Sequence, residues 1–336
     1  MKKRLALSLP GILLMVSAFA SLSAMAHTQE QKEPPKVSEA EAKALEAFNA
    51  AMDPAAKVTT AEEFVKKYPK SPILPQLAEQ TAIAITKVED SNQKLALADR
   101  FQKTFTDASA LTIVNGARLD ALLKAKRNDE AFALGATILG KDPEELRTLV
   151  RLAYYGTEEA KTGNAKNVQQ TQQYALKAIE IIEADRKPAS MNEEAWTSHK
   201  AALPQLYQQT GILSMMMGDP KEAKVKLSKA IALNPSEPSS HAIMAYMINN
   251  EYLDQATKYK EMPEGKEKAE LLPKLEAMID SIIESYARTV ALATGKPEYQ
   301  GLLQQVMPDL TNYYKYRHNQ SVEGLQELID KYKTKP

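Results

Sequence analysis

The sequence predicts an all-α fold, a solenoid of stacked antiparallel helix hairpins. From Glu39 onward Ala, Leu, Glu, Lys and Gln dominate, and Val, Ile and Thr nowhere form the alternating pattern of strands. Turn residues recur about every 35 residues, as at Asp142-Pro143 and Asn234-Pro235, and this spacing is typical of helical repeats. One stretch, residues 211–235, contains two capped helices in succession, and the rest of the chain is interpreted from it.

The first 26 residues predict a secretory signal peptide. A basic start at residues 2–4 precedes an apolar run over residues 5–20, and Ala24-Met25-Ala26 fits a cleavage site after Ala26. An uncleaved membrane anchor is the alternative, but the apolar run is short for a membrane span. We therefore expect a periplasmic or secreted protein with no stable membrane span after removal of the signal.

Two further segments complete the expected domain organisation. Residues 27–38 are polar and contain two prolines, without any helical period, so they predict a flexible tether. Residues 39–336 are then one helical repeat domain. The chain as a whole is long enough for about two ordinary domains, but a repeat array is not limited by that count because each unit packs only against its neighbours.

The turn at Gly218-Asp219-Pro220 joins the two helices of residues 211–235. Glycine suits the left-handed position after a helix, aspartate caps the next helix, and proline is tolerated in its first turn. The second helix then places Ala223, Leu227, Ala230 and Ile231 on one face. Asn234-Pro235 ends it, because the residue before a proline is biased away from helical angles.

With Pro204 as its first position, this stretch resembles the tetratricopeptide repeat, a 34-residue helix–turn–helix unit. Six positions of residues 204–237 agree with the repeat, namely Tyr207, Gly211, Ala223, Leu227, Ala230 and Pro235. Thr210 and Ser214 depart from it, since they stand where Leu and Tyr are usual. The resemblance implies a right-handed solenoid of about seven or eight units, several of them degenerate.

Other windows agree less well with the repeat. Gly135 occupies a position that should be large, and the unit beginning at Pro238 has its second-helix Ala256 one residue out of register. Residues 155–170 predict an elongated loop between helices, and residues 261–265 predict a break. Residues 321–336 predict a last helix with Gly324 and Leu328 on its packed face.

The sequence contains none of the motifs that mark the common catalytic and metal sites. The chain has no Cys, which excludes thiol catalysis and cysteine-ligated zinc or iron–sulfur centres. None of its four His stands at a metal-binding spacing, and no phosphate-binding loop or nucleophile elbow occurs. We therefore predict no catalytic residue, no metal and no cofactor.

The run from Tyr313 to His318 combines aromatic and basic residues, as surfaces for single-stranded nucleic acid do. The chain has 43 basic and 43 acidic residues, however, so no excess of positive charge favours a nucleic acid partner. We instead predict that Tyr313 and Tyr316 pack against the last helix.

The resemblance implies a concave groove lined by the first helix of each hairpin. The groove-facing positions of the clearest repeat and of the next one give the candidate partner-binding residues Gln205, Gln208, Ile212, Met215, Met216, Tyr246 and Asn249. Methionine suits adaptable apolar binding, although Met215 and Met216 are equally expected to pack under a neighbouring helix. The Lys and Arg with which some family members clamp a peptide carboxylate are missing from these positions.

These observations lead to a non-enzymatic scaffold that binds a protein or peptide partner in the cell envelope. Two alternatives stay open. One is an envelope enzyme or polysaccharide-binding accessory whose site is not visible in one sequence, and the other is a structural solenoid that self-associates into a homo-oligomer.

Overall fold

The structure is a computed structural model that describes residues 37–189 and 191–333. The predicted signal peptide and nearly all of the tether lie outside these residues.

The described chain is all-α, with fifteen α-helices and one short 3-10 helix, η1. The first eight helices are α1 (Glu39–Ala50), α2 (Pro54–Lys67), α3 (Leu74–Thr86), α4 (Ser91–Thr104), α5 (Ala108–Lys124), α6 (Asn128–Lys141), α7 (Leu146–Lys161) and α8 (Val168–Glu183). The others are α9 (Glu193–Ala201), α10 (Leu203–Met216), α11 (Pro220–Leu233), α12 (Pro238–Glu261), α13 (Lys266–Ala293), η1 (Pro297–Tyr299), α14 (Gln300–Arg317) and α15 (Leu325–Lys331).

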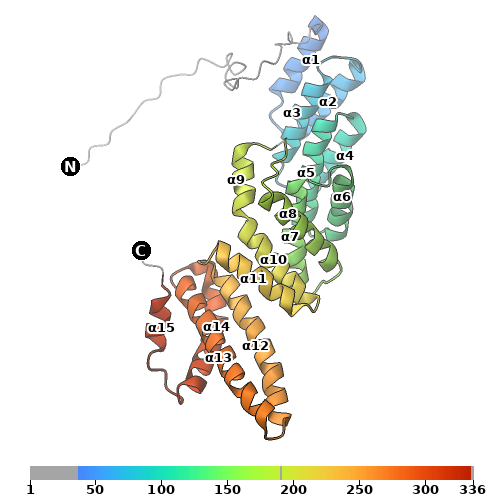
Figure 1. The fold of residues 1–336 in the computed structure, drawn as a ribbon. Coiled ribbons are helices and arrows are strands. Elements are labelled where there is room, and N and C mark those ends of the chain that lie inside the picture. The colour runs from blue at the N-terminus through green and yellow to red at the C-terminus, as the bar shows by residue number, and fades with distance from the viewer. Residues whose placement is uncertain (1–36, 190, 334–336) are drawn as a thin grey trace, which may run out of the picture.

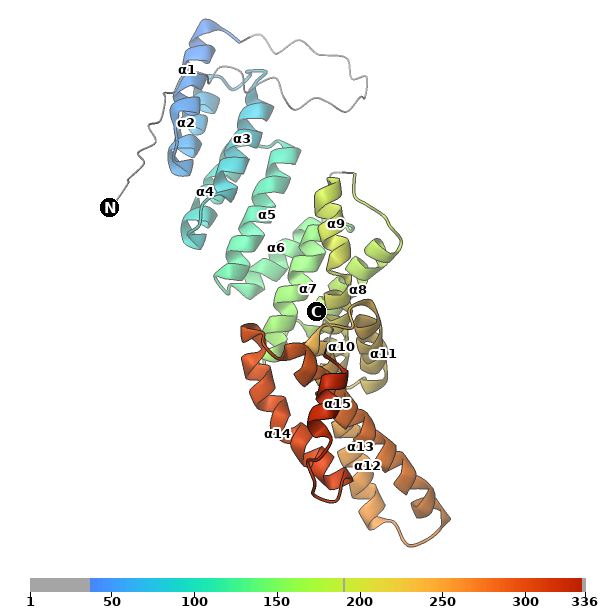
Figure 2. The same ribbon diagram turned by 90° about the vertical axis from the view of Figure 1, so that its left-hand side faces the viewer.

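Consecutive helices pack in pairs, as the sequence predicts. Six pairs form hairpins, namely α1–α2, α3–α4, α5–α6, α7–α8, α10–α11 and α12–α13. A seventh pair, α14 and α15, is less regular because both helices pack on α13. The single helix α9 is inserted between the fourth and fifth hairpins. The stack is elongated, with α1 at one end and the tip of α12–α13 at the other (Figures 1 and 2).

The α10–α11 hairpin has the packing expected from its small residues. A Cβ atom at Gly211 would lie 2.7 Å from Cγ of Leu227, so the two helices approach as closely as glycine permits. Ala223 and Leu227 are both fully buried. Gly218 has a positive φ of 79°, and the Asp219 side chain accepts a hydrogen bond from a backbone N–H in the first turn of α11. The predicted turn chemistry and repeat register are confirmed here.

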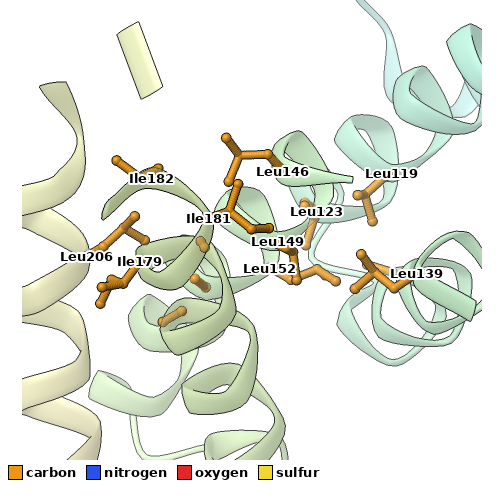
Figure 3. Close-up of a cluster of buried hydrophobic side chains, with 14 of the residues drawn as sticks. Leu119, Leu123, Leu139, Leu146, Leu149, Leu152, Ile179, Ile181, Ile182 and Leu206 are labelled. Carbon is orange, nitrogen blue, oxygen red and sulfur yellow. The ribbon is translucent and has the colours of Figure 1, made fainter. Parts of the chain in front are cut away.

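The hydrophobic core is a succession of clusters and not a single centre. One large cluster spans α1 to α5, a second spans α4 to α11, and a third spans α11 to α15. Figure 3 shows the second, in which Leu119 of α5, Leu149 of α7, Ile181 of α8 and Leu206 of α10 follow one another across the cluster. This is the arrangement expected of a solenoid, where each unit buries its apolar face against its neighbours.

The predicted loop over residues 155–170 is wrong at both ends, since residues 155–161 belong to α7 and residues 168–170 to α8. Helix α7 continues to Lys161, and only residues 162–167 lie between helices. Gly156 stands within the helix, where a Cβ atom would lie 2.2 Å from Oγ1 of Thr171 on α8. Gly135 is a similar contact point, since its Cβ would lie 2.3 Å from Cδ1 of Leu152. Both glycines allow close helix packing, and at Gly135 the large side chain of Leu152 fills the space.

The unit that begins at Pro238 is longer than the repeat predicts. Helix α12 has 24 residues and α13 has 28, so Ala256 belongs to the first helix of this hairpin and not to its second. No proline or glycine follows Pro238 until Pro263, and α12 therefore has no breaker at the point where a 34-residue unit would turn. The predicted break at residues 261–265 is confirmed.

The last helix is shorter than predicted. Gly324 has a φ of 85° and precedes α15, so it lies outside the helix, while Leu328 lies within it. The predicted packing of Tyr313 and Tyr316 against this helix is also wrong. Tyr314 does so instead, because it is buried and donates its hydroxyl to the carbonyl oxygen of residue 323 at 2.8 Å.

Candidate partner-binding surface

The five candidate residues on α10 differ in accessibility. Gln205 is exposed, and Met216 is 42% exposed. Gln208 donates its amide to the hydroxyl of Ser240 on α12 at 2.9 Å. Ile212 is only 4% exposed, and Met215 is half-buried against the third core cluster.

Contacts within the protein therefore occupy most of the predicted α10 face. Ile212 does not line an accessible surface, and Gln208 mainly links α10 to α12. For Met215 the structure supports the alternative in which it packs under a neighbouring helix. Gln205 and Met216 remain available to a partner.

The candidates on α12 belong to a larger aromatic surface. Tyr246 is 50% exposed, and Tyr316 of α14 is 64% exposed. Between the two helices, the Tyr313 hydroxyl donates to Oδ1 of Asn249, and the rings of Tyr252 and Tyr313 meet edge to face at 6.1 Å. We call these five residues the tyrosine surface. The repeat positions identify Tyr246 and Asn249 but not their neighbours on α14, although Tyr313 and Tyr316 stand one helical turn apart.

Burial affects the pKa of two phenols at this surface and of one beneath it. Burial raises the pKa of Tyr252 and of Tyr313, and neighbouring phenols contribute to both increases. Beneath them, Tyr286 of α13 has its pKa raised to about 12 by burial and, secondarily, by Asp309 and the phenols of Tyr313 and Tyr246. An ordinary tyrosine already keeps its proton at pH 7, and the raised pKa values extend the range over which these three phenols can donate as well as accept hydrogen bonds.

A second accessible feature lies between α7 and α10. A recess of about 230 Å³ is lined by Val150, Arg151, Tyr154, Tyr155, Ala202, Gln205, Leu206 and Gln209. Helix α9 lies beside α7 at this place (Figure 2). After burial, the positive charges of Arg147 and Arg151 on α7 further lower the pKa of His199 on α9. The sequence pattern does not predict this recess, because it assigns Tyr155 to a loop and does not mark α9 as a separate helix.

The described residues contain no cluster of metal-ligating side chains. No group of three His, Asp or Glu in this part of the chain could hold a metal ion. Burial lowers the pKa of His199 and of His241, and the ring of His241 lies 2.9 Å from the carbonyl oxygen of Pro235. Among the described helices, none is long and apolar enough to cross a membrane.

Comparisons with known proteins concern only the fold. No family model matches the chain, and no curated protein matches it. The solved structures that resemble it include PilF of Pseudomonas aeruginosa (15% identity, 75% of this chain and 95% of the other, TM-score 0.38) and a thermophilic TPR protein of Thermus thermophilus (14%, 70% and 99%, 0.36). Another is a tetratricopeptide repeat protein of Parabacteroides merdae (14%, 80% and 100%, 0.39). These TM-scores are below 0.5, so the description of the fold rests on the helix pairing of this chain itself.

Proposed function

We propose that this protein is a non-enzymatic scaffold of the cell envelope that binds a protein or peptide partner along the first helices of its array. The tyrosine surface of α12 and α14 is the observation that supports the proposal. The envelope location is based on the signal-like pattern of residues 1–26.

The chemistry of the tyrosine surface suits a polypeptide. Tyrosine is enriched where binding energy concentrates in protein interfaces, because its rigid ring supplies large contact area and its hydroxyl supplies a hydrogen bond. Tyr246 and Tyr316 provide exposed ring area, while the Tyr313–Asn249 hydrogen bond fixes the surface between them. Arg317 is paired with Asp280 at 2.8 Å, so the nearest arginine adds little free positive charge for a nucleic acid.

Affinity capture from envelope extract would test the proposal. The baits are the wild type and the variants Tyr246→Ala and Tyr316→Ala. The matched control is Val225→Ala, because Val225 is 61% exposed and lies on α11, the second helix of its hairpin. All three positions are exposed, so each substitution should change the free energy of unfolding by less than about 0.5 kcal/mol. We expect both tyrosine variants to lose the captured polypeptides by at least about tenfold, as hot-spot residues do, and the control to retain them.

Equal yields from all four baits would contradict the proposal. If the tyrosine variants instead lose retention on an immobilised cell-wall polysaccharide, the accessory hypothesis replaces it. A mass that rises with concentration in light scattering, and falls in the tyrosine variants, would favour self-association through the same surface.

A further inference from the structure

The recess between α7 and α10 is lined by a glutamine whose buried side-chain oxygen receives no hydrogen bond from the described part of the chain. Gln209 is only 3% exposed, and among the described residues no group donates to its Oε1 atom. An unsatisfied buried carbonyl is destabilising, and native proteins seldom retain one without a reason. Gln209 also lines the recess, but its Oε1 atom is itself closed off from solvent. A rotation of the side-chain amide toward the recess is therefore part of binding, and a molecule that enters can then supply the missing donor.

The walls of the recess suit an aromatic ring. Tyr154 and Tyr155 are 40% and 37% exposed, and their rings meet edge to face at 5.2 Å. Val150 and Leu206 complete a lining that is mainly apolar. Aromatic side chains favour such edge-to-face and stacked contacts, and a volume of about 230 Å³ accommodates one ring.

The charge at the recess disfavours an ionised occupant. No carboxylate lines it, and its one charged residue is Arg151, whose Nε lies 2.6 Å from a carboxylate oxygen of Asp120. A lysine or arginine side chain would meet this guanidinium without any anion in the recess. A carboxylate would face both the unsatisfied Gln209 oxygen and the apolar rings. An uncharged donor therefore fits best.

The recess continues toward α12. Gln205 lines it and also lines a second, polar recess of about 430 Å³ that includes Gln208, Ser239 and Tyr299. An extended polypeptide can thus lie across α10 from the first recess to the α12 side of the array. This continuity favours a side chain of a polypeptide over a free small molecule.

We propose that the α7–α10 recess receives a tyrosine or tryptophan side chain of the partner polypeptide, whose O–H or N–H donates to Oε1 of Gln209. The ring lies against Tyr154 and Tyr155. This inference rests on the proposed function, and it adds to that function a defined preference for an aromatic residue that carries a donor.

A pair of small probes isolates the hydrogen bond. N-acetyl-L-tyrosinamide and N-acetyl-L-phenylalaninamide differ by one hydroxyl and would be titrated into the full chain while the amide signals of the protein are followed by NMR. We expect the tyrosine probe to bind about tenfold more tightly, as one neutral buried hydrogen bond allows. In Gln209→Met the preference should vanish, with the thermal midpoint unchanged or higher because an unsatisfied acceptor has been removed.

Gln76→Met is the matched control, since Gln76 is an exposed glutamine on α3, which is the first helix of the α3–α4 hairpin. It should retain the full preference for the tyrosine probe. Tyr154→Ala should weaken both probes alike by removing a wall of the recess. The inference is overturned if the wild type does not distinguish the probes, if neither binds at its solubility limit, if Gln209→Met keeps the preference, or if N-acetyl-L-lysinamide binds more tightly.

The two proposals can fail separately. If the probes are not distinguished but Tyr246→Ala still loses the captured polypeptides, the proposed recognition of an aromatic side chain by the recess is wrong and the scaffold function stands. If the probes behave as expected but both tyrosine variants capture as much as wild type, the recess stands without the tyrosine surface.

Discussion

The α10–α11 and α12–α13 hairpins are neighbours that differ in helix length and in the turn that joins their helices. The first joins two helices of 14 residues each through a tight turn, and Gly211 and Ala223 bring them together. The second joins helices of 24 and 28 residues through residues 262–265. The comparison shows that turn residues set the length of a unit, whereas small residues set how closely its helices pack.

The two hairpins also differ in how much of their surface packs against other helices. In α10–α11 the helix faces are mostly used within the protein, as Ile212 and Leu227 show. In α12–α13 the helices extend past their neighbours, and Leu275 is the outermost buried residue of α13. Tyr246 and Asn249 lie in the first half of α12, where the helix runs beside α14.

The largest expected effect compares one leucine from each hairpin. Leu227→Ala removes a fully buried side chain and should lower the free energy of unfolding by about 2–5 kcal/mol. Leu253→Ala truncates a side chain that is 51% exposed on α12, and should cost less than about 0.5 kcal/mol. Urea titration followed by circular dichroism measures both. A comparable loss in the two variants would mean that the outer part of α12 is covered.

A smaller effect tests the close packing of the regular hairpin. Ala223→Leu should destabilise the protein by about 1–3 kcal/mol, because Ala223 is fully buried and the extra atoms overpack the space beside Gly211. The matched control Val225→Leu lies two residues away on the exposed side of α11, where we expect a change within about 0.5 kcal/mol. If both substitutions are tolerated equally in thermal melts, the repeat register assigned to α11 is incorrect.

The sequence predicted the fold well where local signals act alone. Turn chemistry at Gly218 and Asp219 and the small residue at Gly211 lie within the α10–α11 hairpin itself, so a short window of sequence is enough to predict it. Gly156 was misassigned because a glycine in sequence does not show whether it ends a helix or admits the neighbour Thr171. That distinction depends on which helix lies opposite, and so on the whole array.

The binding surfaces were harder to predict for the same reason. Tyr246 and Asn249 were found because a repeat position specifies which way they face. Tyr313 and Tyr316 were assigned to the wrong neighbour, since the lengths of α12 and α13 decide which helix α14 meets. Nothing in the sequence marks Gln209 as lacking a donor, because a missing contact exists only in three dimensions.

A third prediction compares how the two hairpins begin their second helices. Asp219→Ala should cost about 1 kcal/mol, because the Asp219 carboxylate caps α11 by accepting from the N–H of residue 222 at 3.0 Å. Gly265 directly precedes α13 and supplies no side-chain cap, and the extended backbone there accepts any residue. Gly265→Asp should therefore stabilise by a few tenths of a kcal/mol. Chemical denaturation distinguishes the two signs, and a loss in both variants would refute the capping argument for α13.

The effect that is smallest near neutral pH concerns two buried phenols, one from each hairpin. Burial, followed by the hydrogen bond to Glu183, raises the pKa of Tyr207 on α10 to about 12, and burial, followed by Asp309, raises that of Tyr286 on α13 to about 12. Unfolded tyrosine titrates at about 10, so between about 10 and 12 the native state keeps protons that the unfolded chain has lost. The free energy of unfolding should be constant below this window and fall with rising pH within it.

The two phenols can be separated by removing the second cause of each shift. The Tyr207 hydroxyl donates to Oε1 of Glu183 at 2.8 Å, so Glu183→Gln should lower the pKa of Tyr207 and leave Tyr286 unchanged. Asp309→Asn should do the reverse. Tyrosinate absorbance near the alkaline end, compared with Tyr207→Phe and Tyr286→Phe, assigns each late transition. Burial is the larger cause in both hairpins, so each shift should shrink without disappearing, and a complete return to about 10 would show that charge outweighs desolvation there.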